Sequence, residues 1–145
     1  MKKPVVFLLV LICCVLVAPQ MTQAQCDAQK YSDLALSALP KSYSLAKTYR
    51  VDGRGGERKR IEHTLILNSN TEYVVRISSA DGDSKGLIAT LYDTKHQQLA
   101  TTYANESFLK GFTYQCPMAG RYFLVFSFDQ SENYCGSAVL GFKMP

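Results

Sequence analysis

The sequence lacks several features that would point to a particular chemistry. It has no tryptophan and only two histidines, His63 and His96. No Cys-x-x-Cys pair occurs, and no Cys/His spacing typical of a zinc site. Neither histidine accompanies a nucleophile motif such as Gly-x-Ser-x-Gly. We therefore expect no enzyme and no cofactor, with a small hydrolase as the least favoured alternative.

A strong net charge is also missing. The chain has 16 basic and 12 acidic residues, and its first 24 residues hold two of the basic ones, Lys2 and Lys3, and none of the acidic ones. The remainder therefore has 14 basic and 12 acidic residues, a net charge of +2. So small a charge does not predict a nucleic-acid partner. No second long apolar run follows residues 5–17, so we expect no membrane span in the rest of the chain.

Residues 1–24 have the layout of a cleaved secretory signal. Lys2 and Lys3 precede the apolar run at 5–17, and small residues stand where a signal peptidase reads, ending at Ala24. A membrane anchor is the alternative, but the run is short for a span of about 20 residues. Acylation at Cys26 would need a small residue in place of Gln25. We expect cleavage near Ala24 and a secreted or periplasmic protein.

Three cysteines remain after that cleavage: Cys26, Cys116 and Cys135. Export favours one disulfide, and the odd thiol is left over or links two chains. Cys116 and Cys135 flank a predicted strand at 121–128, which spans roughly 26 Å, whereas a disulfide needs Cα atoms within about 7 Å. We favour a bridge that uses Cys26. A Cys116–Cys135 bridge stays open if the loop from Asp129 folds back.

One helix is predicted, over residues 27–39. Asp27 can cap its start and Pro40 ends it. Apolar residues recur at helical spacing and form one stripe: Ala28, Tyr31, Leu34, Ala35 and Ala38. We expect this helix to cover an open end or edge of a sheet. An amphipathic helix that binds a partner or a membrane surface is the alternative.

From Tyr43 the pattern changes to strands. Eight segments with alternating or apolar character are separated by turn residues, at 43–51, 60–67, 72–79, 87–92, 98–103, 112–116, 121–128 and 136–143. No βαβ alternation occurs. The pattern predicts an all-β fold, an antiparallel jelly-roll-like sandwich of about eight strands preceded by the short helix. The expected organisation is a signal at 1–24, the helix and linker at 25–42 and the sandwich at 43–145.

Two stretches resemble the bacterial pre-peptidase C-terminal (PPC-type) domains. Residues 87–101, LIATLYDTKHQQLAT, resemble the "LYD, turn, polar, LA-small" hairpin of that family. Phe112-Thr-Tyr followed by PMAGRYFLVF at 117–126 resembles its "F-T-x, P-x-x-G-x-Y-x-x-x-V" stretch. The resemblance covers roughly residues 60–143. It implies an eight-stranded secreted sandwich, often appended to proteases, that serves adhesion, substrate attachment or secretion and is not itself catalytic.

Two residues of the second motif have a physical role that can be predicted. Gly120 is expected to give the turn before residue 121 a backbone angle that other residues avoid. Tyr122 is expected to place its ring in the core while its hydroxyl reaches the backbone at the end of the sheet.

The segment Asp81-Gly82-Asp83-Ser84 is the best metal candidate. Two carboxylates and a hydroxyl around a flexible glycine can surround a calcium ion with oxygen ligands. The pattern lacks the bidentate glutamate of an EF-hand, and Asp-Gly is also a common turn. A plain loop is therefore the favoured alternative to calcium binding at Asp81, Asp83 and Ser84.

Two further groups are candidate ligand contacts. A basic cluster is formed by Arg54, Arg58, Lys59 and Arg60, which could bind an acidic glycan or lipid head group or simply lie in solvent. Aromatic residues in or beside predicted loops could stack on a sugar: Tyr103, Phe108 and Tyr134.

The favoured function is an exported, non-catalytic binding or adhesion module of a bacterial envelope or secreted fraction, with a glycan, matrix or protein ligand. The alternative is a structural envelope subunit that assembles through the N-terminal helix or the spare cysteine.

Overall fold

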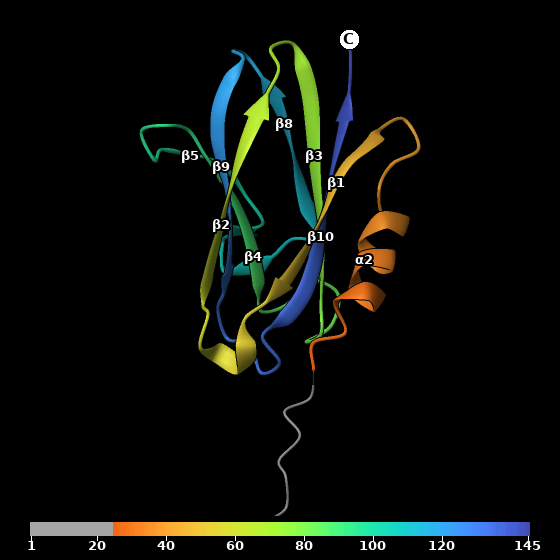
Figure 1. The fold of residues 1–145 in the computed structure, drawn as a ribbon, viewed down its shortest axis with the longest axis vertical. Coiled ribbons are helices and arrows are strands. Elements are labelled where there is room, and N and C mark those ends of the chain that lie inside the picture. The colour runs from red at the N-terminus through yellow and green to blue at the C-terminus, as the bar shows by residue number, and fades with distance from the viewer. Residues whose placement is uncertain (1–24) are drawn as a thin grey trace, which may run out of the picture.

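The computed structural model describes residues 25–145, and the predicted signal segment lies outside them. Two four-stranded antiparallel sheets face each other (Figure 1). The first has the order β1 (Ser44–Asp52), β10 (Cys135–Lys143), β3 (Thr71–Ser79) and β8 (Gly111–Cys116). The second has the order β2 (Arg60–Leu67), β9 (Gly120–Phe128), β4 (Leu87–Tyr92) and β5 (Gln98–Thr101). Two short strands, β6 (Tyr103–Ala104) and β7 (Ser107–Phe108), form a separate hairpin.

This order confirms the predicted jelly-roll-like sandwich. The first strand pairs with the last, the second with the last but one, and β4 with β5, so the chain wraps as one long folded ribbon. The strand count is slightly higher than predicted because the β6–β7 hairpin replaces part of an expected loop. Among the described residues no helix is long and apolar enough to cross a bilayer.

Alternation along the strands builds the core between the sheets. On β2 the inward side carries Ile61, His63, Leu65 and Leu67, which alternate along the strand, and burial increases toward Leu67. The central strand β9 contributes the most fully buried large side chains, including Leu124 and Phe126. Burying a side chain of this size stabilises the fold by about 1.5–3 kcal/mol.

Helix α2 (Ala28–Ser37) covers the outer face of the first sheet, over β10, β3 and β1 (Figure 1). Asp27 caps it, accepting a hydrogen bond from the amide of Lys30. The buried face differs from the predicted stripe, since Ser32 is buried and Leu34 is half exposed. Small residues face the sheet, so Ser32 Oγ reaches Ser137 Oγ on β10 at 2.6 Å. The sequence pattern favoured large apolar residues and missed this close polar contact.

The predicted strand at 98–103 is shorter in the structure. β5 ends at Thr101. The next residue, Thr102, is fully buried, and its Oγ1 accepts a hydrogen bond from the amide of Ala89 at 2.8 Å. This side-chain oxygen takes the place of the backbone carbonyl that would accept the bond in a regular strand pair. The chain then leaves the sheet as the β6–β7 hairpin, where Leu109 N donates to Thr102 O.

Of the two residues singled out in the second PPC-like stretch, Tyr122 has the predicted role and Gly120 does not. Tyr122 is buried and its hydroxyl donates to the carbonyl of Met118 at 2.7 Å, as predicted. The prediction for Gly120 is wrong, because this residue begins β9 and does not have a positive φ. The space around it is open, so nothing in the fold requires glycine there.

Candidate binding site

A disulfide joins Cys26 to Cys135, with 5.3 Å between their Cα atoms. It ties the segment before α2 to the start of β10 and uses Cys26, as the sequence favoured. Cys116 is the remaining free cysteine of the described chain, and it is fully buried. We call the end of the sandwich that holds this bond the disulfide end; loops 53–59, 80–86 and 129–134 form it.

The strand register explains why Cys116 does not pair with Cys135. Cys116 lies opposite Thr71 at one end of β3, and Gly136 lies opposite Ser79 at the other end. That length of strand spans about 26 Å at about 3.3 Å per residue. The Cys116 thiol instead donates to the carbonyl of Met118 inside the core. A buried thiol in this position is not presented to another chain.

Asp81 holds two of the three loops together. One of its carboxylate oxygens accepts from Ser131 Oγ at 2.5 Å. The other accepts from the backbone of Glu132 and Asn133 and from Asn133 Nδ2 at 2.6 Å. Gly86 fits against this cluster with φ +76°, and a Cβ there would lie 2.7 Å from Asp81 Oδ2. Loops 80–86 and 129–134 therefore form one hydrogen-bonded unit.

Loop 53–59 is fixed to the same unit. Gly53 N donates to Tyr134 O at 2.8 Å, and Arg58 N donates back to Gly53 O at 2.9 Å. A Cβ on Gly53 would lie 2.8 Å from the Phe128 ring, so only glycine fits this close approach. Arg54 has a φ of 50° and is held there by its amide, which donates to Asp52 Oδ1 at 2.8 Å. A left-handed non-glycine residue of this kind costs energy and persists only where its surroundings fix it.

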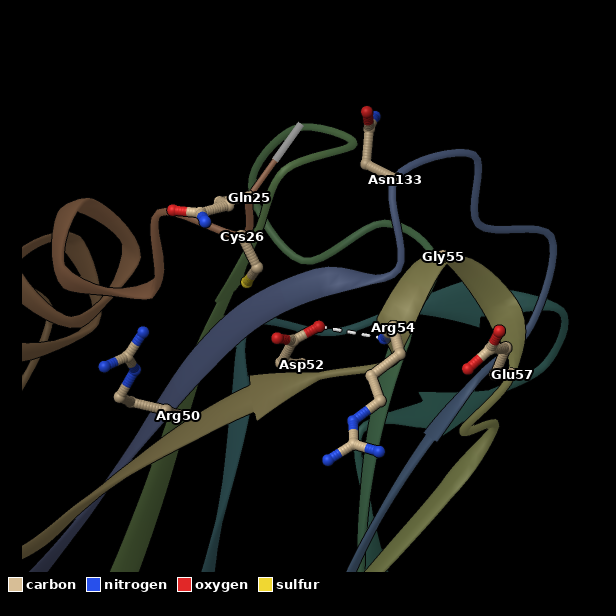
Figure 2. Close-up of a pocket in the computed structure, with 8 residues that line it drawn as sticks. All are labelled: Gln25, Cys26, Arg50, Asp52, Arg54, Gly55, Glu57 and Asn133. Carbon is tan, nitrogen blue, oxygen red and sulfur yellow. Dashed lines mark hydrogen bonds between the residues drawn. The ribbon is translucent and has the colours of Figure 1, made fainter. Parts of the chain in front are cut away.

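A hollow of about 420 Å³ opens at this end, between the disulfide and the 53–59 loop (Figure 2). It is lined by Gln25, Cys26, Arg50, Asp52, Arg54, Gly55, Glu57 and Asn133. Figure 2 shows Asp52 between the two arginines, with its bond to the Arg54 amide dashed.

The two arginines are exposed, and no carboxylate of residues 25–145 binds their guanidinium groups. Within residues 25–145 the ion pairs join Arg60 to Glu62 and Lys110 to Asp83. Guanidinium groups bind carboxylates, sulfates and phosphates through paired N–H donors. The disulfide end therefore offers unpaired cationic donors from strand β1 (Arg50) and from a loop whose backbone is fixed (Arg54).

The structure places only part of the predicted basic cluster at the hollow. Arg54 lines it, whereas Arg58, Lys59 and Arg60 are exposed beyond it and are not among its lining residues. Arg60 pairs with Glu62 at 3.3 Å and lies over the Tyr92 ring, 5.9 Å from its centroid. The sequence did not single out Arg50, whose position beside the hollow depends on the pairing of β1 with β10.

The predicted calcium ligands have separate contacts. Asp81 holds the loops as described, Asp83 is exposed and pairs with Lys110 at 3.1 Å, and Ser84 is buried. No group of three or more His, Cys, Asp or Glu side chains arranged to hold a metal occurs in residues 25–145. Calcium binding at this loop stays a prediction.

The three predicted aromatic contacts fall in two places. Tyr103 and Phe108 face each other on the β6–β7 hairpin, with ring centroids 5.0 Å apart. Tyr134 lies at the disulfide end, packed edge-on against Phe128 at 5.6 Å and beneath Gly56. Tyr134 therefore supports the loop beside the hollow, and stacking on a sugar by Tyr103, Phe108 or Tyr134 stays a prediction.

The two histidines lie apart in the fold, His63 on β2 and His96 in the turn between β4 and β5. His96 stacks on Phe123, with ring centroids 5.1 Å apart. His63 lies 4.8 Å from Tyr49 and 5.9 Å from Phe126, again between ring centroids. Burial, and then the positive charge of Lys47, lower the pKa of His63. Burial raises the pKa of Tyr49 to about 12.

A second hollow, of about 360 Å³, was not predicted. It lies in what we call the β1–β2 seam, the opening between residues 46–49 of β1 and residues 64–68, which end β2 and begin the turn after it. These two edge strands belong to different sheets, so no local pattern could reveal the opening. One signal was present in the sequence: the alternation of β1 puts Lys47 on the same side of the strand as the buried residues Tyr49 and Val51.

No family model matches this sequence, and no curated protein matches it. Among solved structures, the chain is similar to the Aeromonas hydrophila PliG, a periplasmic lysozyme inhibitor of g-type lysozyme. That likeness has a TM-score of 0.44 and 11% identity and covers 71% of this chain and 89% of the other. It is also similar to the pre-peptidase C-terminal domain of a Bacillus anthracis collagenase, with a TM-score of 0.41 and 18% identity, covering 67% and 86%. The second is a domain of the family that the sequence motifs resemble.

Proposed function

We propose that this protein is an exported, non-catalytic binding module whose disulfide end binds a ligand carrying acidic groups. The observation that carries the proposal is the hollow beside Arg50 and Arg54, whose guanidinium groups bind no carboxylate of the described chain. The loops around it are held by the disulfide and by the Asp81 hydrogen bonds. A site that is already rigid loses little conformational entropy when it binds.

The disulfide supports the exported location. Disulfides of this kind form and persist in oxidising compartments. The bond also fixes the N-terminal segment beside the hollow, since both Cys26 and Gln25 line it. The stabilising link and the proposed ligand site thus occupy the same end of the sandwich.

A structural subunit linked through the spare cysteine is the less favoured function. Cys116 is fully buried, so an intermolecular bond at this residue would require the core to open. Assembly through α2 has some support, because Leu34 and Leu36 of the helix are exposed.

Binding to polygalacturonate, a carboxylate-bearing polysaccharide, tests the proposed site. We expect the purified, oxidised protein to bind it and not to bind a neutral glucan, and we expect binding to weaken as salt increases. The double variant Arg50→Gln, Arg54→Gln should lower the affinity about ten-fold or more, because each charged hydrogen bond contributes about 1.5–3 kcal/mol.

The double variant Arg121→Gln, Lys143→Gln is the matched control, because it also removes two positive charges and Lys143 is exposed at the end of β10. Arg121 is exposed at the start of β9, opposite Ile66 and so at the far end of the sandwich. Equal losses in the control and in the Arg50→Gln, Arg54→Gln variant would contradict the proposed site, since they would show binding through net charge alone.

A further inference from the structure

The sandwich is closed along one side and open along the other. β5 and β8, the edge strands on one side, contact each other, whereas β1 and β2 make no comparably extensive contact. The hollow of about 360 Å³ lies in this β1–β2 seam. Its size falls within the roughly 300–1,000 Å³ that small-molecule sites occupy.

The inner wall of the seam is apolar. Leu65 and Leu67 of β2 face Tyr73 of β3 and Leu140 of β10 across the hollow, and all four belong to the core. Their exposed fractions lie between 2% and 8%, so this wall consists of core side chains that are themselves almost fully covered. Ile66, at the rim, is 73% exposed. An apolar chain lying in the seam would extend the core outward.

A buried hydroxyl without a partner lines the same hollow. Tyr49 is only 3% exposed, and its hydroxyl makes no hydrogen bond. The other two buried tyrosines are paired: Tyr73 Oη accepts the amide of Asn68 at 2.9 Å, and Tyr122 donates to Met118 O. Buried polar side-chain atoms are nearly always hydrogen-bonded. Within residues 25–145 the hydroxyl of Tyr49 has no such partner and is enclosed by its neighbours, so a ligand atom that entered the hollow and displaced them would supply the missing acceptor.

Positive charge stands at the mouth of the seam. Lys47 lines the hollow, with its Nζ 5.2 Å from the centroid of the Tyr49 ring, and no carboxylate of the described chain pairs with it. The register of β1 shifts between Leu45 and Lys47, which places the bulge residue Ala46 at the rim beside Lys47. Bulges commonly re-aim the side chains next to them.

We propose that the β1–β2 seam binds a single-chain amphiphile with a carboxylate head. The apolar chain packs against Leu65, Leu67 and Leu140, and the carboxylate accepts a hydrogen bond from Tyr49 and pairs with Lys47. A carboxylate can accept a hydrogen bond from a hydroxyl donor and pair with an ammonium group at the same time. This site shares no residue with the hollow at the disulfide end and does not depend on the function proposed for it.

Calorimetric titration with decanoate, below the concentration at which it forms micelles, tests the proposal. We expect saturable binding of one decanoate per protein. Tyr49→Phe should weaken it about ten-fold, because a hydrogen bond to a charged group is lost. Lys47→Met should weaken decanoate binding and leave binding of decanol, which has the same chain without the charge, unchanged.

Lys59→Met is the control, since it removes the same charge from a loop outside the seam. NMR amide shifts caused by decanoate should centre on residues 46–49 and 64–68, which locates the ligand even if a variant folds poorly. Absence of saturable binding would overturn the proposal. So would equal affinity for decanol and decanoate, amide shifts elsewhere, or a protein that is dimeric in solution with the seam covered by a second copy.

Discussion

The disulfide end and the β1–β2 seam use polar groups in opposite ways. At the disulfide end each oxygen of Asp81 is hydrogen-bonded, and a covalent bond ties the start of the described chain to β10. In the seam, the hydroxyl of Tyr49 is buried without a partner in residues 25–145, and so is Nε2 of the adjacent His63, whose ring centroid lies 4.8 Å from that of Tyr49. One region is fixed before any ligand arrives, and the other keeps unmet hydrogen-bonding capacity beside core side chains.

This difference indicates where the fold is stabilised and where it can change. Satisfied polar networks make a region rigid, whereas a buried unpaired group costs free energy until something pairs with it. Substitutions at the disulfide end should therefore lower stability, and substitutions that remove the unpaired groups of the seam should not.

Removing the disulfide should have the largest effect. The bond closes a loop over a sequence separation of 109 residues, and a cross-link over so long a loop restricts the unfolded chain strongly. The double variant Cys26→Ser, Cys135→Ser should lower the free energy of unfolding by about 2–5 kcal/mol, measured by urea denaturation. Cys116→Ala is the control, with an expected loss of about 1 kcal/mol. A smaller loss for the double variant than for the control would contradict the assigned pairing.

Asp81→Ala should have the second largest effect. We expect it to lower the unfolding free energy by about 2 kcal/mol, because it leaves hydrogen-bond donors of the 129–134 loop unpaired. Asp83→Ala, two residues away, removes an exposed ion pair with Lys110 and should cost less than about 1 kcal/mol. Similar losses in the two variants would show that the loops are not joined through Asp81.

The same pair of variants tests the calcium prediction by calorimetry, because calcium binding at this loop would require both carboxylates.

Removing the unpaired hydroxyl of the seam should not lower the unfolding free energy, in contrast to the substitutions at the disulfide end. In the absence of ligand, Tyr49→Phe should leave the unfolding free energy unchanged or raise it by up to about 1 kcal/mol, because it removes an unpaired buried hydroxyl. Tyr73→Phe should lower it by about 1 kcal/mol, because Asn68 N loses its acceptor. Thermal or chemical denaturation of both variants measures the contrast. A clear loss for Tyr49→Phe would mean that this hydroxyl is already paired in the free protein.

The smallest expected effect is a change in how the unfolding free energy depends on pH. Burial and Lys47 lower the pKa of His63 in the folded protein below its ordinary value of about 6.5. The unfolded chain then binds more protons than the folded one as pH falls from about 6.5 toward the folded pKa, so stability decreases over that range. His63→Gln should flatten the dependence of unfolding free energy on pH below about 7. His96→Gln, in an exposed turn, is the control, and an equal flattening there would remove His63 as the cause.

Sequence patterns predicted most of the strands because alternation is a local property. The inward side of β2 and the role of Tyr122 follow from residue spacing and from the chemistry of one side chain. The buried face of α2 did not follow, because Ser32 is buried through its bond to Ser137, more than a hundred positions away. Arg50 and the seam were missed for the same reason. The neighbours of Arg50 are set by the pairing of β1 with β10, and the seam lies between the edges of two sheets that are brought side by side only by folding.

The jelly-roll order also sets the sequence of events in folding. β1 pairs only with β10, and β2 pairs only with β9, so the first two strands have no sheet partner until nearly the whole chain is available. Contacts this distant in sequence slow folding, because the chain must close large loops before it gains their stability. A chain that emerges gradually from a translocation channel would therefore hold β1 and β2 unpaired until its last residues arrive. The edges that border the seam are the ones exposed longest, and the inward lysine of β1 is the kind of residue that keeps such an edge from joining a neighbouring chain.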